Sequence, residues 1–134
     1  MAGTCAVRLT RYYRASPAEV WAALTDADSI ARWLAPVGSF DLSRGSSVQL
    51  QVGSDLSLDA KVRAVESERL LELDWMVPGE EPSVVRFELR PDGDGTVLAL
   101  DHRLIDARVG MRAMGIWENH LTRLDTLLGE GETR

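Results

Sequence analysis

From residue 38 to residue 105, apolar residues tend to recur at every second position, and short turn sequences interrupt the pattern. This alternation is typical of β-strands with one buried face. Because the turns are short, we expect neighbouring strands to pair antiparallel as a meander. The predicted strands cover residues 38–42, 46–52, 56–66, 69–77, 83–90 and 96–105.

One more strand and three helices flank this region. Residues 5–14 also alternate and predict a first strand, and Ser16 followed by Pro17 is typical of a helix start. Two short helices are expected between Pro17 and Pro36, and a long amphipathic helix over residues 108–128. We therefore predict an α+β fold whose seven-stranded antiparallel sheet lays its apolar face on the terminal helix.

Length and charge narrow the class of protein. The 134 residues fit one domain, which we expect to span residues 1–134. A net charge of −6 disfavours nucleic acid and anionic membranes as partners, and no apolar run reaches the roughly 20 residues of a membrane span. The lone Cys5 and the lack of a signal-peptide pattern indicate a cytoplasmic protein.

Common catalytic motifs are missing from the sequence. The two histidines and one cysteine lack the spacing of metal ligands, and no glycine-rich loop suits a phosphate. No serine stands in a nucleophile elbow. We therefore expect no metal, no cofactor, and neither hydrolase nor kinase activity.

Four segments together resemble a known family. They are "RASPAEVWAALTDADSIARWLAP" near the start, "ESERLLELDW" and "VRFELRPDGDGTVLALDHR" in the middle, and "GIWENHLTRLDTLL" at the end. Their order is similar to the activator-of-heat-shock-ATPase (AHSA-like) branch of the START/Bet v 1-like superfamily, also called SRPBCC. "SRGS" and "GIW" stand where that family often has a glycine pair and a Gly-Trp.

The resemblance implies a helix-grip fold. In it a curved seven-stranded antiparallel sheet, with two short helices after the first strand, wraps around the C-terminal helix and leaves a cavity between them. Family members include lipid and polyketide binders, cyclases and cochaperone-like domains, so the fold alone does not select a function.

His102 is the first candidate for chemistry. Strand alternation places it on one face with Leu98 and Leu100, and places Asp101 and Arg103 on the other. The charged pair should face water, so His102 should point inward, where it would serve as a hydrogen-bonding anchor or a general base. The alternative, a core histidine with satisfied nitrogens, is favoured by the usual burial of such residues.

Two charged residues are also open between a role in the cavity and a position in contact with solvent. Arg11 shares a strand face with Tyr13, so it would pair inward with a ligand carboxylate or with Glu118. We favour the alternative that Arg11 reaches solvent from an edge position. Glu118 lies near the apolar stripe of the terminal helix, and a place at the boundary of that stripe is favoured. His120 is expected on the solvated side.

Large apolar side chains are predicted to fill the space between sheet and helix. Such aromatic and thioether groups suit an adaptable cavity, and equally suit a plain core. The group consists of Trp75, Phe87, Met111, Met114 and Trp117. For Trp33 two roles remain open, that of a core residue and that of a lid at the cavity mouth.

Our first functional hypothesis is a protein that binds a small apolar molecule, aromatic or acyl, in this cavity. The residues expected to contact it are Arg11, Tyr13, Trp33, Trp75, Phe87, Leu100, His102, Met111, Met114, Trp117 and Glu118. A second hypothesis is a polyketide cyclase or aromatase-like enzyme with His102 as acid-base group, which we favour less. A third is a cochaperone-like interaction domain; a homodimer through an edge strand is compatible with all three.

Overall fold

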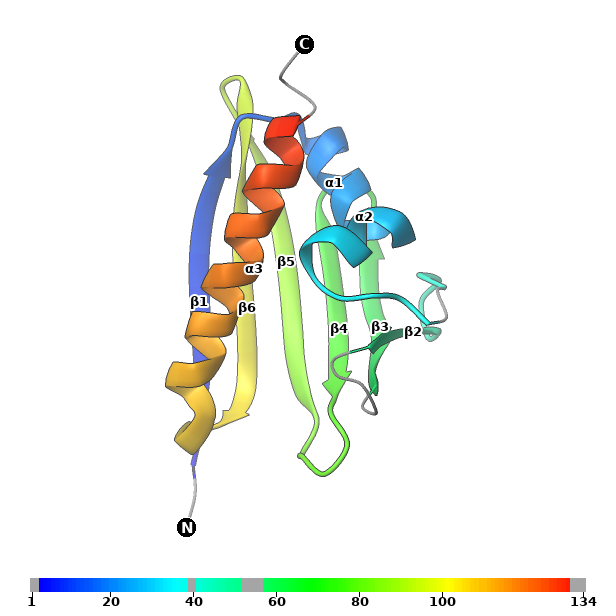
Figure 1. Ribbon diagram of the computed structural model, residues 1–134, viewed down its shortest axis with the longest axis vertical. Helices are drawn as coiled ribbons and strands as arrows, with labels where there is room; N and C mark the ends of the chain where they lie inside the picture. Colours follow the sequence, from blue (N-terminus) through cyan, green and yellow to red (C-terminus); the bar gives the residue numbers. More distant parts are fainter. Residues whose placement is uncertain (1–2, 39–40, 52–56, 131–134) are drawn as a thin grey trace.

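The computed structural model describes residues 3–38, 41–51 and 57–130, which form an α+β domain with one antiparallel sheet and a long C-terminal helix (Figure 1). Helix α3 runs along one face of the sheet, and α1 and α2 cover the same face beside it. The elements are β1 (Thr4–Tyr13), α1 (Pro17–Thr25), α2 (Ala27–Trp33), β2 (Ser47–Gln51), β3 (Ser57–Glu66), β4 (Leu70–Met76), β5 (Ser83–Asp92), β6 (Gly95–Asp106), η1 (Ala107–Val109) and α3 (Gly110–Glu130).

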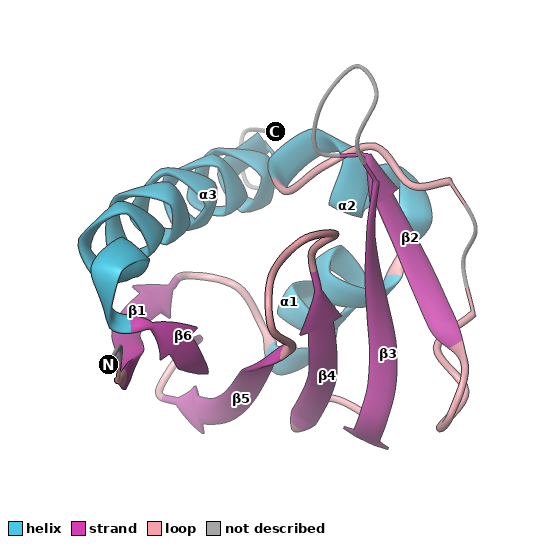
Figure 2. Cartoon of the chain, turned by 90° about the horizontal axis from the view of Figure 1, so that it is seen from below, coloured by secondary structure: helices cyan, strands magenta, loops and turns pink. Residues whose placement is uncertain are grey.

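The sheet has six strands in the order β1-β6-β5-β4-β3-β2. Strands β2 to β6 are paired in the order of the sequence, and β1 completes the sheet beside β6. The sheet curves around the helices, as Figure 2 shows from below. Strands β1 and β2 are its two edges.

We expected a strand over residues 38–42, and the described part of this segment does not form one. Residues 39–40 lie outside the described part of the chain, and residues 41–42 are not in a strand. Nearby, Val37 makes only an isolated bridge to Leu50, and the Gln51 N–H donates to the Pro36 carbonyl at 2.8 Å. The Gly38 N–H also donates to the Gln49 carbonyl at 2.8 Å, so the described residues of this segment pair with β2 at only a few positions and form no strand.

Local signals explain where α1 and α2 begin. The Ser16 hydroxyl accepts from the Glu19 N–H at 3.1 Å while the Glu19 carboxylate accepts from the Ser16 N–H at 2.9 Å, which is a capping box. Asp26 caps α2 by accepting from the Ser29 N–H at 3.0 Å. The Trp33 indole donates to the Ala23 carbonyl at 2.8 Å and ties the two helices together.

Helix α3 is anchored to the sheet mainly by its second half. Trp117, Leu121 and Leu124 are buried against the sheet. The Tyr13 hydroxyl on β1 donates to the Leu121 carbonyl at 3.0 Å. By contrast, Met111 in the first turn is 93% exposed. No helix in the described residues is both long enough and apolar enough to cross a membrane.

A β-bulge interrupts β6 close to its end. Between the pairs Val7↔His102 and Cys5↔Ile105, β6 has one residue more than β1. Leu104 sits in this bulge with a φ of 63° and a half-exposed side chain. A non-glycine residue in the left-handed region is strained, and bulges redirect the side chains around them.

The outer face of the sheet carries a cluster of charges centred on Glu72, which is only 8% exposed. Its carboxylate is 3.2 Å from the guanidinium groups of Arg86 and Arg103 and 3.5 Å from that of Arg63. Arg63 also pairs with Asp74 at 2.9 Å. The buried carboxylate on β4 therefore has three positive neighbours, which come from β3, β5 and β6.

Candidate functional site

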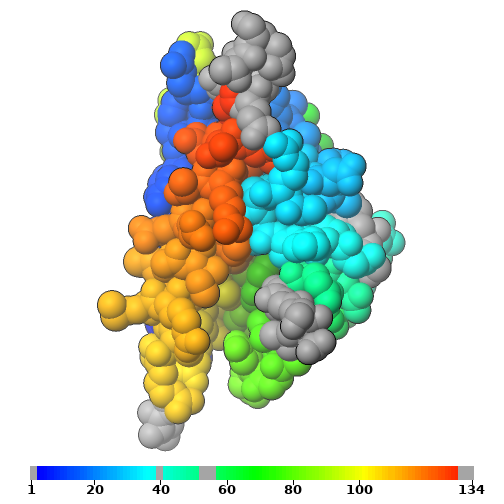
Figure 3. Space-filling view, in the orientation of Figure 1, coloured from blue at the N-terminus to red at the C-terminus, as the bar shows by residue number. Residues whose placement is uncertain are grey.

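Two adjoining hollows lie where the first turns of α3 separate from the sheet, and we call them together the His102 cleft. The larger, of about 600 Å³, lies between the β4–β5 turn, the end of β6, η1 and α3. The smaller, of about 430 Å³, lies between α3, residues 34–36 and strands β2 and β3. Both are lined by Trp75, Val77, His102, Ala113 and Ile116. Figure 3 shows the opening as a notch between the yellow-orange start of α3 and the green β4–β5 turn.

An aromatic cluster borders the two hollows: Trp75 and His102 line both of them, and Trp117 lines the smaller one. The ring centroids of Trp75 and Trp117 are 5.6 Å apart, and that of His102 is 5.9 Å from Trp117 and 6.1 Å from Trp75. Phe87 continues the cluster into the core at 5.9 Å from Trp117. A flat ligand would therefore meet rings already held in place by the core.

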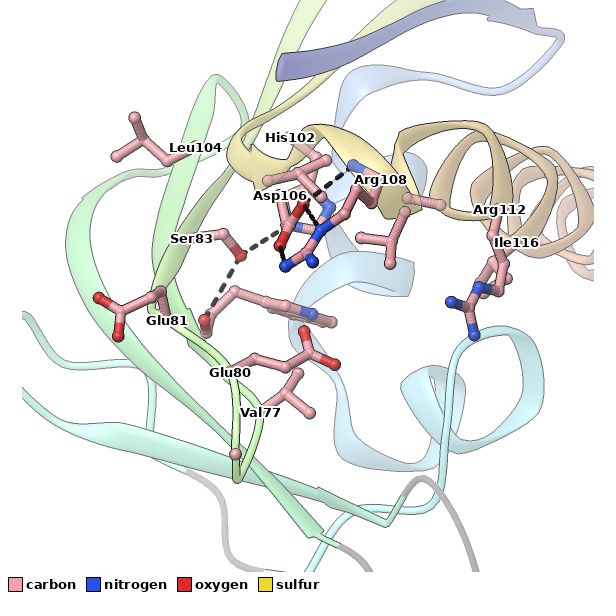
Figure 4. A pocket seen from close by; sticks show the side chains of 15 residues that line it. Val77, Glu80, Glu81, Ser83, His102, Leu104, Asp106, Arg108, Arg112 and Ile116 are labelled. Carbon is pink, nitrogen blue, oxygen red and sulfur yellow. Dashed lines mark hydrogen bonds and ion pairs between the residues drawn. The ribbon is translucent and has the colours of Figure 1, made fainter. Parts of the chain in front are cut away.

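His102 is hydrogen-bonded through both ring nitrogens. The Trp117 indole N–H donates to Nδ1 at 2.9 Å, and Nε2 lies 2.8 Å from the Ser83 hydroxyl oxygen. An indole N–H can only donate, so Nδ1 carries no proton and Nε2 carries the proton of the neutral ring. Figure 4 shows Ser83 and His102 joined in this way from neighbouring strands.

Burial keeps His102 uncharged. Only 6% of the residue is exposed, and desolvation lowers the pKa of His102 from 6.5 to about 4, opposed weakly by the charge of Asp101. A second ring proton would also face the Trp117 N–H and break that hydrogen bond. The imidazole is therefore neutral at pH 7, with no free nitrogen to act as a base.

The mouth of the larger hollow is charged. Arg108 holds Asp106 with two side-chain contacts, of 3.1 Å to Oδ1 and 2.7 Å to Oδ2, which lower the pKa of Asp106 to about 2. Arg112 lines the same hollow and makes no ion pair within the described chain. Glu80 approaches from the opposite wall, on the β4–β5 turn (Figure 4).

Three of the residues singled out from the sequence meet in the His102 cleft, namely Trp75, His102 and Trp117. They come from β4, β6 and α3. His102 points inward, as alternation predicts, and the structure shows both its nitrogens satisfied. Its surroundings therefore match the alternative of a satisfied histidine, although the ring also lines the cleft.

Several expected contacts lie elsewhere in the structure. Trp33 and Phe87 are core residues that line a void of about 30 Å³ and neither hollow of the His102 cleft. Leu100 is buried and lines none of the hollows described. Tyr13 is a buried anchor for α3. These four side chains are inward-facing, as expected, but the helices and α3 fill the space beside them.

Four of the residues expected to contact a ligand do not line the His102 cleft, namely Met111, Met114, Arg11 and Glu118. This is a correction to our expectation. Met111 and Met114 are 93% and 40% exposed, because they lie on the flank of α3 away from the cleft. Arg11 and Glu118 are partly exposed and face each other at 3.9 Å on the outside of the β1 edge. The snorkelling alternative for Arg11 and the boundary alternative for Glu118 therefore describe their positions.

Sequence reasoning missed Ser83, Ala113, Ile116 and His120, which line the cleft. His120 was expected in solvent, but its ring lies 5.6 Å from that of Trp117 and its Nδ1 is buried without a hydrogen-bond partner in the described part of the chain. Burial lowers the pKa of His120. Ala113, Ile116 and His120 lie at positions i, i+3 and i+7 of the helix, and this spacing was a usable signal for a second face.

Comparison with known proteins identifies the family. The family model for "Activator of Hsp90 ATPase homolog 1-like protein" matches residues 14–129. The chain belongs to this family. No curated protein matches the chain. Among the residues that the structure describes, no group of three or more acidic, histidine or cysteine side chains is arranged to hold a metal ion.

Solved structures resemble this chain along most of its length. CalU16 from Micromonospora echinospora is 27% identical, with a TM-score of 0.82 over 95% of this chain and 81% of that one. MLL2253 from Mesorhizobium loti is 27% identical, with a TM-score of 0.86 over 94% and 98%. DynU16, from the dynemicin biosynthetic locus, is 24% identical with a TM-score of 0.85 over 94% of this chain, which spans 48% of DynU16.

Proposed function

We propose that this protein binds a small, largely apolar molecule with a flat ring system in the His102 cleft. The observation that carries the proposal is the aromatic wall in which Trp75 and His102 line both hollows, of about 600 and 430 Å³, and Trp117 lines the smaller one. Ligand sites typically measure about 300–1,000 Å³ and combine apolar walls with a few polar groups. Membership of the family agrees with ligand binding.

A cleft-filling substitution tests this proposal with 8-anilinonaphthalene-1-sulfonate as the fluorescent probe. Ala113 lines both hollows, so Ala113→Trp should block the probe and weaken binding about tenfold or more, as expected for the loss of a filled apolar site. Met111→Trp places the same side chain on the same helix at a position 93% exposed, and should bind like wild type. Equal binding by wild type and Ala113→Trp would contradict the proposal.

Native mass spectrometry of freshly purified protein complements this test. A retained small-molecule adduct that Ala113→Trp loses would identify the ligand class by its mass. The same spectrum reports whether the chain is a monomer or a dimer.

The geometry favours binding over acid-base catalysis by His102. Nδ1 is occupied by the Trp117 indole, and Nε2 is protonated and directed at Ser83, so the ring has no lone pair free to remove a proton. A cyclase-like reaction that depends on His102 would require this network to break.

A protein-interaction role is the second candidate, because the family is named for activation of an ATPase. The Aha1 relative from Colwellia psychrerythraea, 18% identical with a TM-score of 0.81 over 92% of this chain and 96% of that one, is a dimer in solution. Strand β1 is an edge strand here and could pair with a second copy. A dimer mass without an adduct in the native spectrum would favour this role.

A further inference from the structure

Three side chains from different elements form a hydrogen-bond relay that ends in the His102 cleft. Trp117 on α3, His102 on β6 and Ser83 on β5 are 3%, 6% and 8% exposed. Their contacts are 2.9 Å from the indole nitrogen to Nδ1, and 2.8 Å from Nε2 to the hydroxyl oxygen. Buried polar groups with such short contacts have fixed hydrogen-bonding roles.

The relay has one possible direction. Because the Trp117 indole can only donate, His102 accepts at Nδ1 and must donate from Nε2. The Ser83 oxygen is then the acceptor of that proton, so its own O–H has to point elsewhere. The sole acceptor recorded for it in the described chain is the Trp75 carbonyl at 3.5 Å, the outer limit of a hydrogen bond.

The Ser83 hydroxyl is placed to donate its own proton to a ligand. Its side chain lines the larger hollow, and the paired part of β5 and β6 ends at the next residue, Val84, which pairs with Arg103. Leu104, the residue of β6 that follows Arg103, lies in the bulge opposite β1. The hydroxyl therefore lies at the floor of the cleft beside a gap in strand pairing (Figure 4).

We infer that the His102 cleft selects ligands that carry a carbonyl-type oxygen, which accepts the hydroxyl proton of Ser83 while the ring system lies against Trp75, which lines the same hollow as Ser83. Ketones, quinones and carboxylates belong to this class. Arg112, which lacks an ion pair within the described chain and lines the same hollow, supplies a further donor at the mouth. The inference rests on the proposed function and adds the ligand group that the site recognises.

The direction of the relay is tested on the protein alone. Long-range ¹H–¹⁵N spectra of ¹⁵N-labelled wild type report which nitrogen of His102 is protonated, with His102→Gln used to assign the signals. We expect the Nε2–H tautomer at neutral pH. The Nδ1–H tautomer would overturn the inference, because Ser83 would then donate to His102 and not to a ligand; it would leave the proposal of a binding cleft intact.

Matched probes test the selection itself. The pairs 1-indanone with indane and 9-fluorenone with fluorene differ only in a carbonyl oxygen, and ¹⁵N spectra of the tryptophan indole groups follow their binding. In wild type we expect the ketone of a pair to bind about fivefold more tightly than its hydrocarbon, the gain typical of one neutral hydrogen bond. Equal affinities would overturn the inference alone, whereas no binding by any of the four would overturn it together with the proposed function.

The variant Ser83→Ala assigns the preference to one atom. It should lower the ratio of ketone affinity to hydrocarbon affinity to less than about twofold. A preference that survives the substitution would overturn the inference. If Ser83→Ala does not fold, the tautomer and the wild-type probe pairs still decide the question.

Discussion

The neutral state of His102 makes the stability of the protein depend on pH. The pKa of this residue is lowered by burial to about 4, whereas in the unfolded chain it returns to about 6.5. Between these values the unfolded state binds a proton that the folded state does not, so stability is present above pH 6.5 and is lost as the pH falls toward 4. A shift of this size corresponds to about 3 kcal/mol.

The variant His102→Gln isolates this effect. Glutamine can accept from Trp117 and donate to Ser83 but does not titrate, so His120 and the carboxylates contribute equally in both proteins. Urea unfolding from about pH 7 to about pH 4 should show the stability of wild type falling relative to that of the variant. Parallel pH curves for the two proteins would contradict the assignment of a depressed pKa to His102.

Glu72 should be the most sensitive charge on the outer face of the sheet. Its substitution by glutamine leaves three arginines without their common anion, and we expect a loss of about 1–3 kcal/mol in unfolding free energy. Glu88→Gln is the matched control, since this carboxylate is more exposed and, among the described residues, pairs with Arg86 alone at 3.2 Å; we expect a loss of less than about 1 kcal/mol there. Similar losses of unfolding free energy in the two variants would show that the burial of Glu72 adds nothing to the stabilising effect of its ion pairs.

At the scale of elements, local signals in the sequence predicted most of what is observed. Two-residue alternation located the strands from β2 to β6, and helical spacing located α3. Two-residue alternation does not indicate whether a short segment pairs with another strand. For this reason the prediction of a strand over residues 38–42 was wrong. Periodicity likewise placed Met111 near the stripe of α3 without revealing that the first turns of this helix leave the sheet.

The capping box of α1 offers a test at this scale. Ser16→Ala removes the acceptor of the Glu19 N–H and should cost about 1 kcal/mol of stability. Glu19→Gln keeps an acceptor for the Ser16 N–H and should cost clearly less. Chemical unfolding followed by circular dichroism compares the two, and a larger loss for Glu19→Gln would contradict this account.

At the scale of the whole molecule, the cleft was harder to predict than the fold. Its walls come from segments far apart in the chain, including residues 34–36, the β4–β5 turn and the first turns of α3. The bulge at Leu104 shapes the end of β6, and nothing in the sequence around it signals a left-handed residue. Trp75, His102 and Trp117 could be named from alternation and helical spacing, but Ser83 depends on the pairing of β5 with its neighbours.

The division between the anchored half of α3 and its free first turns has an evolutionary consequence. Leu121 and Leu124 fasten the helix in the core, while Ala113 and Ile116 face the cleft and contribute little to that fastening. Substitutions at Ala113 and Ile116 can therefore change the shape of the cleft while the folded state keeps its margin of stability. A single ancestral scaffold of this kind can acquire new ligands by drift at a few tolerant positions, without first evolving a more stable core.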